Sequence, residues 1–303
     1  CCSSANMRAA GSELVFEVLQ AARRPGVAPL GSAFPGPELF PLDQLARAAS
    51  QSLRTLAPQD IIENLSPGNA RLREHIATRY RLDGVSVAPQ EIVLTHGALE
   101  GLNVALQVVT QPGDTVVTES PAFYASLQAI ERLKLRALAL PTDPVEGLDL
   151  DALEQALRSQ RIAACWLMPT YQNPLGCLMP TTRKRALVEL LSRHEVPLIE
   201  DDVYGELYFG SQRPQPAKAF DRSGLVLHCG SFSKSLAPGY RLGWIAAGRY
   251  QQRVQRLILM TTMATSLPAQ AALLNYLERG VYDRHLRRLR GALAQRIQVA
   301  RRE

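Results

Sequence analysis

The sequence predicts an α/β fold in which a mainly parallel central sheet carries helices on both faces. Short apolar runs of strand type alternate with amphipathic stretches of helical period along most of the chain. Polar turns follow several of these runs, where open α/β sheets place their ligands. With 303 residues and a 46% hydrophobic composition, the chain can bury a sizeable core and hold more than one domain.

Seven apolar runs are predicted to be strands: residues 92–95, 115–118, 135–140, 163–168, 197–201, 226–230 and 242–247. The last run follows its predecessor after a short connection, so we expect it to be antiparallel in an otherwise parallel sheet. Helical patterns lie between the strands, among them 151–159 and 182–194. We expect Asp149 to cap the first of these helices and Thr181 or Thr182 to cap the second.

The segment 231–243 sets a lysine, a hydroxyl and an arginine within one turn, as Lys234, Ser231 and Arg241. That combination suits a phosphorylated aldehyde. The lysine amine can form an imine with the aldehyde carbon, while the hydroxyl and the guanidinium hold the phosphate. The other three lysines, Lys134, Lys184 and Lys218, are expected to be solvated surface groups.

Acids follow the predicted strand 197–201, where Asp201 and Asp202 precede Tyr204. A carboxylate at this position can pair with a protonated pyridine nitrogen and keep such a ring electron-withdrawing. Asn173, in a turn fixed by Pro174, can donate to a phenolic oxygen of the same ring.

A strand-to-helix switch at residues 92–100 places Gly97, Ala98 and Leu99 at a helix start. Free backbone N–H groups at a helix N-terminus form a ready anion site. We therefore expect a phosphate group to meet the backbone of these three residues.

Five motifs in this order resemble fold-type I, class I/II aminotransferases, which use pyridoxal 5′-phosphate: Gly-Ala-Leu at 97–99, Asn-Pro-x-Gly at 173–176, Asp-x-x-Tyr at 201–204, Ser-x-x-Lys at 231–234 and Arg-x-Gly at 241–243. Within that family, segments 29–35, 39–41 and 200–204 are similar to the effector domains of MocR-type regulators in the GntR superfamily. Those proteins resemble an aminotransferase fused behind a winged helix. The resemblance runs from about Pro29 to the last residue.

The resemblance implies a role for each matching residue. Lys234 would form the imine with the cofactor and then shuttle a proton. Asp201, three residues before Tyr204, would pair with the pyridine nitrogen. Asn173 and Tyr204 would bond the phenolic oxygen. The phosphate would meet Ser231, Arg241 and the backbone of Gly97, Ala98 and Leu99. For Phe123, stacking on the ring and packing in the core stay open as alternatives.

The resemblance also implies the organisation of the chain: an N-terminal arm over 1–41, a large cofactor-binding domain over 42–281, and the start of a connecting helix over 282–303. The family's small C-terminal domain, with its carboxylate-binding arginine, is then largely missing. Segment 61–68 lacks the family's intersubunit phosphate tyrosine. We expect a homodimer, with segment 261–266 at its interface.

Three functions remain open from the sequence. The first is a transaminase acting on amino acids and 2-oxo acids. The second is a sensor domain of a MocR-type regulator, with DNA bound only through a domain not in this chain. The third is a truncated core of a longer protein that binds the cofactor weakly or fails to fold, since a cut helix exposes apolar surface. The amino donor is not identified.

The charge distribution and the cysteines of the chain indicate what it contacts and in which compartment it resides. The net charge of +6 resides in residues 279–303, which carry eight arginines and two acids. A basic stripe of this kind can contact nucleic acid, but no helix-turn-helix pattern or metal-binding cysteine spacing accompanies it. We therefore interpret the segment as a solvated helix face. Cys165 and Cys229 lie in apolar runs and are expected to be buried, reduced thiols. Reduced thiols predict a cytoplasmic protein. The sequence contains no apolar stretch long enough for a membrane span, and its N-terminus has no signal-peptide layout.

Overall fold

The computed structural model describes residues 33–302 continuously, together with 17, 20–21 and 24–27; Cys1 and Cys2 lie outside these ranges. Eight strands form one sheet with the order β1-β8-β7-β6-β5-β2-β3-β4. Their bounds are β1 Ile92–Thr95, β2 Thr115–Ser120, β3 Arg136–Asp143, β4 Gly147–Leu148, β5 Ala164–Leu167, β6 Leu198–Asp201, β7 Val226–Ser231 and β8 Gly243–Ala246. All seven predicted strands are present; β1 has the predicted bounds, and the ends of the others shift by at most three residues.

The sheet is mainly parallel, as predicted. Strands β3, β2, β5, β6 and β7 pair in parallel, whereas β8 is antiparallel to both β7 and β1. The antiparallel prediction for residues 242–247 is therefore confirmed. The short strand β4 was not anticipated. Its pairing with β3, in which Thr142 faces Leu148, explains why β3 extends past the predicted end.

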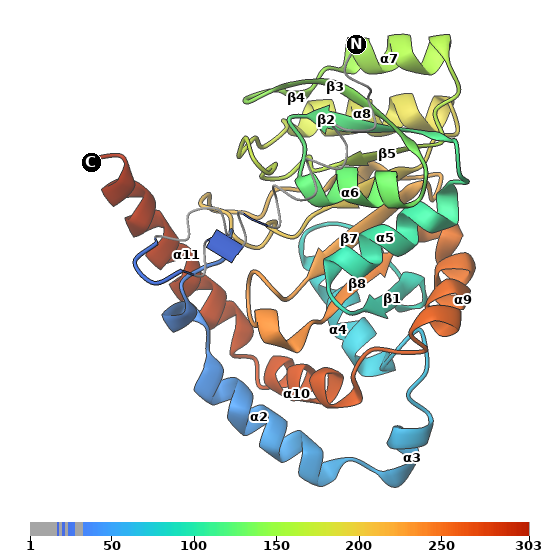
Figure 1. Ribbon diagram of the computed structural model, residues 1–303. Coiled ribbons are helices and arrows are strands. Elements are labelled where there is room, and N and C mark those ends of the chain that lie inside the picture. The colour runs from blue at the N-terminus through green and yellow to red at the C-terminus, as the bar shows by residue number, and fades with distance from the viewer. Residues whose placement is uncertain (1–16, 18–19, 22–23, 28–32, 303) are drawn as a thin grey trace.

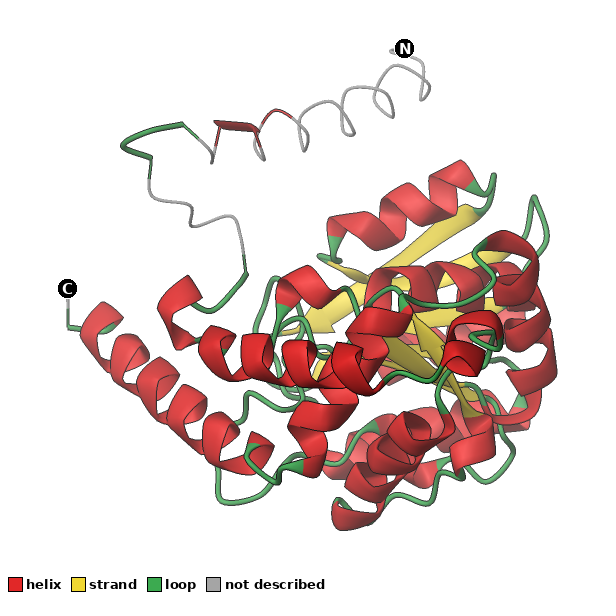
Figure 2. Cartoon of the chain, turned by 90° about the horizontal axis from the view of Figure 1, so that it is seen from below, coloured by secondary structure: helices red, strands yellow, loops and turns green. Residues whose placement is uncertain are grey.

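Helices cover both faces of the sheet (Figure 1). The α-helices of the described chain are α2 Leu42–Thr55, α3 Pro58–Ile62, α4 Ala70–Leu82, α5 Ala98–Val109, α6 Tyr124–Arg132, α7 Leu150–Ser159, α8 Thr181–Arg193, α9 Gln251–Thr261, α10 Leu267–Glu278 and α11 Tyr282–Ala300. Short 3-10 turns are η1 Pro37–Leu39, η2 Pro89–Glu91, η3 Ala217–Phe220, η4 Pro238–Tyr240 and η5 Gly248–Tyr250. Helix α2 lies alongside α10, and α11 runs along the outside of the body to the C-terminus (Figures 1 and 2).

Neighbouring residues of each strand pack into different hydrophobic clusters, because successive side chains point to opposite faces of a sheet. Val116 and Ile199 pack with α5, α6 and α9 on one face. Val117 and Leu198 pack with α7 and α8 on the other face. On that second face, at the β1 and β8 end, Leu94 packs with α4 and α10. Buried apolar side chains on both faces thus explain why these strands are continuous hydrophobic runs.

The two predicted helix caps have different outcomes. Asp149 caps α7, and its carboxylate accepts from the backbone N–H of Asp151 and of Ala152, each at 3.0 Å. The cap predicted for α8 is wrong. Pro180 occupies the N-cap position without a side-chain bond, and Thr181 is already the first helical residue.

Two lysines predicted to be solvated are buried. The Lys184 ammonium donates to Thr170 Oγ1 at 2.6 Å and to the Gln215 carbonyl at 2.8 Å. The Lys218 ammonium pairs with Asp221 at 2.9 Å and donates to the Val226 carbonyl at 2.8 Å. A lysine can be buried when carboxylates and carbonyl oxygens satisfy its ammonium, and sequence position alone does not reveal those partners.

Cys165 and Cys229 are buried and free, as predicted. Among the described helices, none has the length and apolar character needed to span a bilayer.

Candidate active site

A cavity of 710 Å³ opens at the carboxyl ends of the parallel strands. Nine of the ten predicted site residues line it: Ala98, Leu99, Phe123, Asn173, Asp201, Tyr204, Ser231, Lys234 and Arg241. They come from five separate stretches of the chain, and the parallel topology brings these stretches to one edge. The tenth residue, Gly97, lies against the Arg241 side chain.

Lys234 follows β7, and its amine is held by the segment that precedes α2. The ammonium donates to the Ala33 carbonyl at 2.7 Å and lies 3.4 Å from the centre of the Phe34 ring. Burial lowers the pKa of this amine to about 8, with Arg241 acting in the same direction and Asp201 opposing both. A substantial fraction of the amine is therefore neutral near physiological pH, the form that attacks an aldehyde.

Asp201 ends β6 and is almost fully buried at the wall of the cavity. Burial raises the pKa of its carboxyl to about 7. The only hydrogen bond found for its side chain among the described residues is a long one, 3.4 Å, from the backbone N–H of Val203. A cation that approached this carboxylate would stabilise its charged form.

Asp202, next along the chain, belongs to a different environment. Its Oδ2 lies 3.0 Å from His228 Nε2 and 2.7 Å from Arg213. Burial disfavours its charge, but Arg213 and His228 outweigh burial and hold the pKa below its ordinary value. Asp201 thus lines the cavity, whereas Asp202 is not among its lining residues. The pairing of Asp201 with a ring nitrogen stays a prediction.

Tyr204 and Asn173 lie together at the cavity wall. Burial raises the pKa of the tyrosine hydroxyl to about 12, while the nearby Asn173 side chain acts in the opposite direction. The tyrosine therefore keeps its proton at neutral pH and can donate it to an oxygen in the cavity. Its ring lies 5.5 Å from the Lys234 ammonium.

A cradle suited to an anion forms at one end of the cavity. Arg241, in the left-handed region with φ 47°, donates to Ser233 Oγ at 3.3 Å and to the His96 carbonyl at 3.2 Å. Ser231 Oγ lies 3.0 Å from Ser233 Oγ. The N-terminus of α5, at Ala98, completes the cradle, since the first N–H groups of a helix lack intrahelical partners.

Gly97 tests the fit of this cradle. Its φ is +82°, and a Cβ added there would lie 2.8 Å from Arg241 Nη2. Only a residue without a side chain lets the guanidinium approach the helix start so closely. An arginine, hydroxyls and helix N–H groups form the donor set that binds phosphate, so these residues fit a phosphorylated cofactor.

Phe123 lines the cavity, with its ring centre 4.8 Å from that of Tyr124 in a tilted arrangement. Its side chain is half-buried at the cavity wall, and stacking on a ring stays a prediction.

Several residues at the site were not anticipated. Ser233 joins Ser231 in the cradle. Its position two residues after Ser231 is a feature of the sequence that could have indicated this second hydroxyl. Phe34 covers Lys234, which no local pattern indicates. Glu119, buried at the end of β2, accepts from the Met168 backbone N–H at 3.0 Å, and burial raises the pKa of its carboxyl to about 7. Met168 itself lines the cavity.

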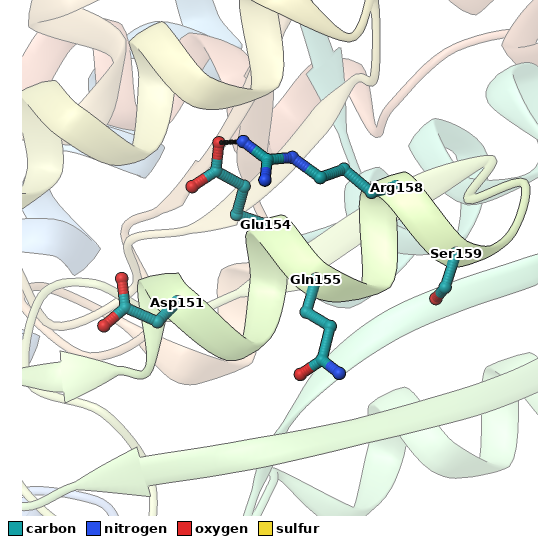
Figure 3. Close-up of a pocket in the computed structure, with 5 residues that line it drawn as sticks. All are labelled: Asp151, Glu154, Gln155, Arg158 and Ser159. Carbon is teal, nitrogen blue, oxygen red and sulfur yellow. Dashed lines mark hydrogen bonds and ion pairs between the residues drawn. The ribbon is translucent and has the colours of Figure 1, made fainter.

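A second hollow, beside α7, has a different character (Figure 3). All of its lining residues come from one helix, and Glu154 and Arg158 already pair with each other at 2.7 Å. Glu154 also lies 4.0 Å from the guanidinium of Arg193 in α8, so its charge is already met by two arginines. Within the described ranges, no cluster of histidine, cysteine or acidic side chains has the geometry to hold a metal ion.

Comparisons with known proteins give a consistent result. The model of the family "Aminotransferase class I and II" matches residues 33–303. The uncharacterized HTH-type transcriptional regulator YdcR of Escherichia coli K12 is 56% identical over 94% of this chain, and the chain spans 61% of that protein's length. Aromatic-amino-acid aminotransferase 1 of Thermococcus litoralis is 31% identical, with 90% of this chain and 67% of the relative covered.

A solved structure agrees with these sequence relatives. LysN, an α-aminoadipate aminotransferase of Thermus thermophilus complexed with N-(5′-phosphopyridoxyl)-L-leucine, superposes with a TM-score of 0.77. The identity is 31%, and 86% of this chain and 66% of the LysN chain are covered.

Proposed function

Since the chain belongs to the class I and II aminotransferase family, we propose that it binds pyridoxal 5′-phosphate in the 710 Å³ cavity and transfers an amino group between amino acids and 2-oxo acids. One observation carries this proposal. A single cavity holds a lysine with a lowered pKa, a buried aspartate and an anion cradle, and nothing else in the described chain combines these groups.

The residues that would hold the cofactor follow from this arrangement. The cradle of Ser231, Ser233, Arg241 and the α5 N-terminus would take the phosphate. Asp201 would face the ring nitrogen, while Asn173 and Tyr204 would face the phenolic oxygen. When bound, the cofactor supplies an aldehyde that condenses with amines and a ring that delocalises the electron pair left after loss of a Cα proton.

The protein's own groups would then manage charge and protons. Lys234, with a pKa of about 8, can accept a proton from the substrate Cα and later return it, because an effective base has a pKa near the working pH. Asp201 can remain charged once a ring N–H pairs with it, since a nearby cation lowers the pKa of a carboxyl. Tyr204 keeps its proton and orients the ring oxygen.

The regulator relatives support a second candidate function. The 56% identity to an HTH-type regulator favours a sensor domain that uses the same cavity to bind an amine or the cofactor. DNA contact would then be made by a domain that these 303 residues do not contain. We further propose that the protein forms a homodimer. We also propose that it is organised as an N-terminal arm up to residue 41, a large domain over 42–281 and a connecting helix from residue 282.

An absorbance experiment tests the proposed function. The full chain is loaded with pyridoxal 5′-phosphate and mixed with single amino acids, and the aminated cofactor and the 2-oxo acid are measured by chromatography. Stoichiometric formation of both products with at least one amino acid supports amino transfer. A visible-absorbance change without either product favours the sensor. Absence of both products with every amino acid contradicts amino transfer, and absence of any absorbance change when pyridoxal 5′-phosphate itself is added contradicts both functions.

A further inference from the structure

We propose that Tyr282 and His285 of α11 are positioning residues for Lys234, and that both act through Ser235. This inference rests on the proposed function, because it concerns the residue that would bind the cofactor. Helix α11 does not line the cavity, yet its first turns contact the residue that directly follows Lys234.

The first contact joins two hydroxyls. Tyr282 Oη lies 2.7 Å from Ser235 Oγ, and both side chains are buried. The Tyr282 ring packs edge-on against Phe232, two residues before Lys234, with ring centres 6.1 Å apart. Burial raises the pKa of the tyrosine hydroxyl, so the hydroxyl stays protonated. The tyrosine thus contacts the turn on both sides of Lys234.

The second contact involves the backbone. His285 Nε2 lies 2.7 Å from the Ser235 carbonyl oxygen. A carbonyl oxygen only accepts, so Nε2 must carry the proton. Burial lowers the pKa of the imidazole, which favours its neutral form. Nδ1 is buried and has no partner within the described residues. His285 is therefore a neutral donor in one defined tautomer, directed at one carbonyl.

Together these bonds fix Ser235 through its side chain and its carbonyl. The turn itself is closed by the backbone N–H of Leu236 and of Ala237, which donate to the Phe232 carbonyl at 2.8 and 3.0 Å. Lys234 lies inside this turn, and its side chain is only partly buried. A reactive amine needs a fixed backbone beneath it, since small misplacements of a reacting group lower rates steeply.

Packing between helices is the competing explanation for these contacts. Tyr276 of α10 provides the matched control. It is fully buried, and its hydroxyl has no hydrogen-bond partner within the described residues. Tyr276→Phe removes a buried hydroxyl from the same core without touching the Lys234 turn, so any effect specific to Tyr282→Phe reports on the bond to Ser235.

The experiment compares Tyr282→Phe, His285→Leu, His285→Gln and Tyr276→Phe in the full chain. The first readout is hydrogen exchange at the Leu236 amide without cofactor. Tyr282→Phe and His285→Leu are expected to speed this exchange about fivefold, the effect of one lost hydrogen bond. His285→Gln, which keeps an N–H donor, should recover part of the protection. Tyr276→Phe should match the parent.

The second readout is the rate at which pyridoxal 5′-phosphate becomes linked to Lys234, measured by borohydride trapping. We expect Tyr282→Phe and His285→Leu to slow it at least threefold and Tyr276→Phe to leave it unchanged. The inference is overturned if both rates match those of Tyr276→Phe, or if exchange accelerates equally throughout α10 and α11 without slower linkage. If the unsubstituted chain does not link pyridoxal 5′-phosphate to Lys234, the proposed function fails. The exchange rates still decide whether Tyr282 and His285 hold the turn at Ser235.

Discussion

Replacing Asp201 by asparagine is expected to stabilise the cofactor-free chain at neutral pH. The carboxyl is almost fully buried, and its pKa rises from 3.8 to about 7 because burial disfavours the charged form. The folded state therefore keeps a proton that the unfolded state has released between about pH 4 and pH 7. Stability falls as the pH rises through this window, and an asparagine, which cannot ionise, removes that loss.

The size of the effect follows from linkage between the two pKa values. With 3.8 for the unfolded state and about 7 for the folded state, ionisation of Asp201 costs about 2 kcal/mol at pH 5 and about 4 kcal/mol at pH 8. The free energy of unfolding of Asp201→Asn should thus exceed that of the parent by about 2–3 kcal/mol more at pH 8 than at pH 5.

Urea unfolding of the cofactor-free chain at pH 5 and pH 8, followed by circular dichroism, measures this difference. Asp202→Asn is the matched control, because Asp202 is also buried but is paired with Arg213 and His228. The pKa of its carboxyl lies below the ordinary value, so its contribution is present above about pH 4. Asp202→Asn should therefore lower stability at both pH values, by about 2 kcal/mol. A pH-independent difference for Asp201→Asn, or the same sign for both variants, would refute the reasoning.

Three further predictions follow from single contacts. Gly97→Ala puts a side chain on a residue at φ 82° and ψ 169°, a conformation that L residues rarely adopt, and it also displaces the Arg241 guanidinium. It should therefore weaken pyridoxal 5′-phosphate binding at least tenfold in a fluorescence titration, and unchanged affinity would contradict the cradle. Asp149→Ala removes the α7 cap and should lower the free energy of unfolding by about 1 kcal/mol, whereas Asp151→Ala should not reproduce the full loss. Leu72 is a buried residue of α4, so Leu72→Ala should lower the free energy of unfolding in urea by about 2–5 kcal/mol. A loss below about 1 kcal/mol would contradict close packing around this side chain.

Much of the fold could be predicted because the signals are local. Seven apolar runs became strands, since residues buried on both faces of a sheet leave continuous hydrophobic segments. The α7 cap was also predictable, because an aspartate at the N-cap bonds N–H groups two and three residues ahead. The α8 cap was predicted wrongly, because Pro180 takes the N-cap position and leaves Thr181 at the first helical position.

The candidate site divides in the same way. The sequence could predict that its motifs meet at one cavity, because the carboxyl ends of parallel strands lie at the same edge of a sheet. Contacts between distant segments could not be predicted. Phe34 lies over an amine two hundred positions along the chain, and Tyr282 and His285 reach Ser235 from a helix beyond the sheet. The burial of Lys184 was missed because its oxygen partners come from separate loops.

Borohydride trapping followed by peptide mass analysis tests the central claim most directly. The chain is incubated with pyridoxal 5′-phosphate, reduced and digested, and the modified lysine is located among Lys134, Lys184, Lys218 and Lys234. We predict stoichiometric modification of Lys234, loss of visible absorbance in Lys234→Ala, and no change in Lys134→Ala. Modification at another lysine, or visible absorbance that persists in Lys234→Ala, would contradict the assignment of this cavity as the cofactor site.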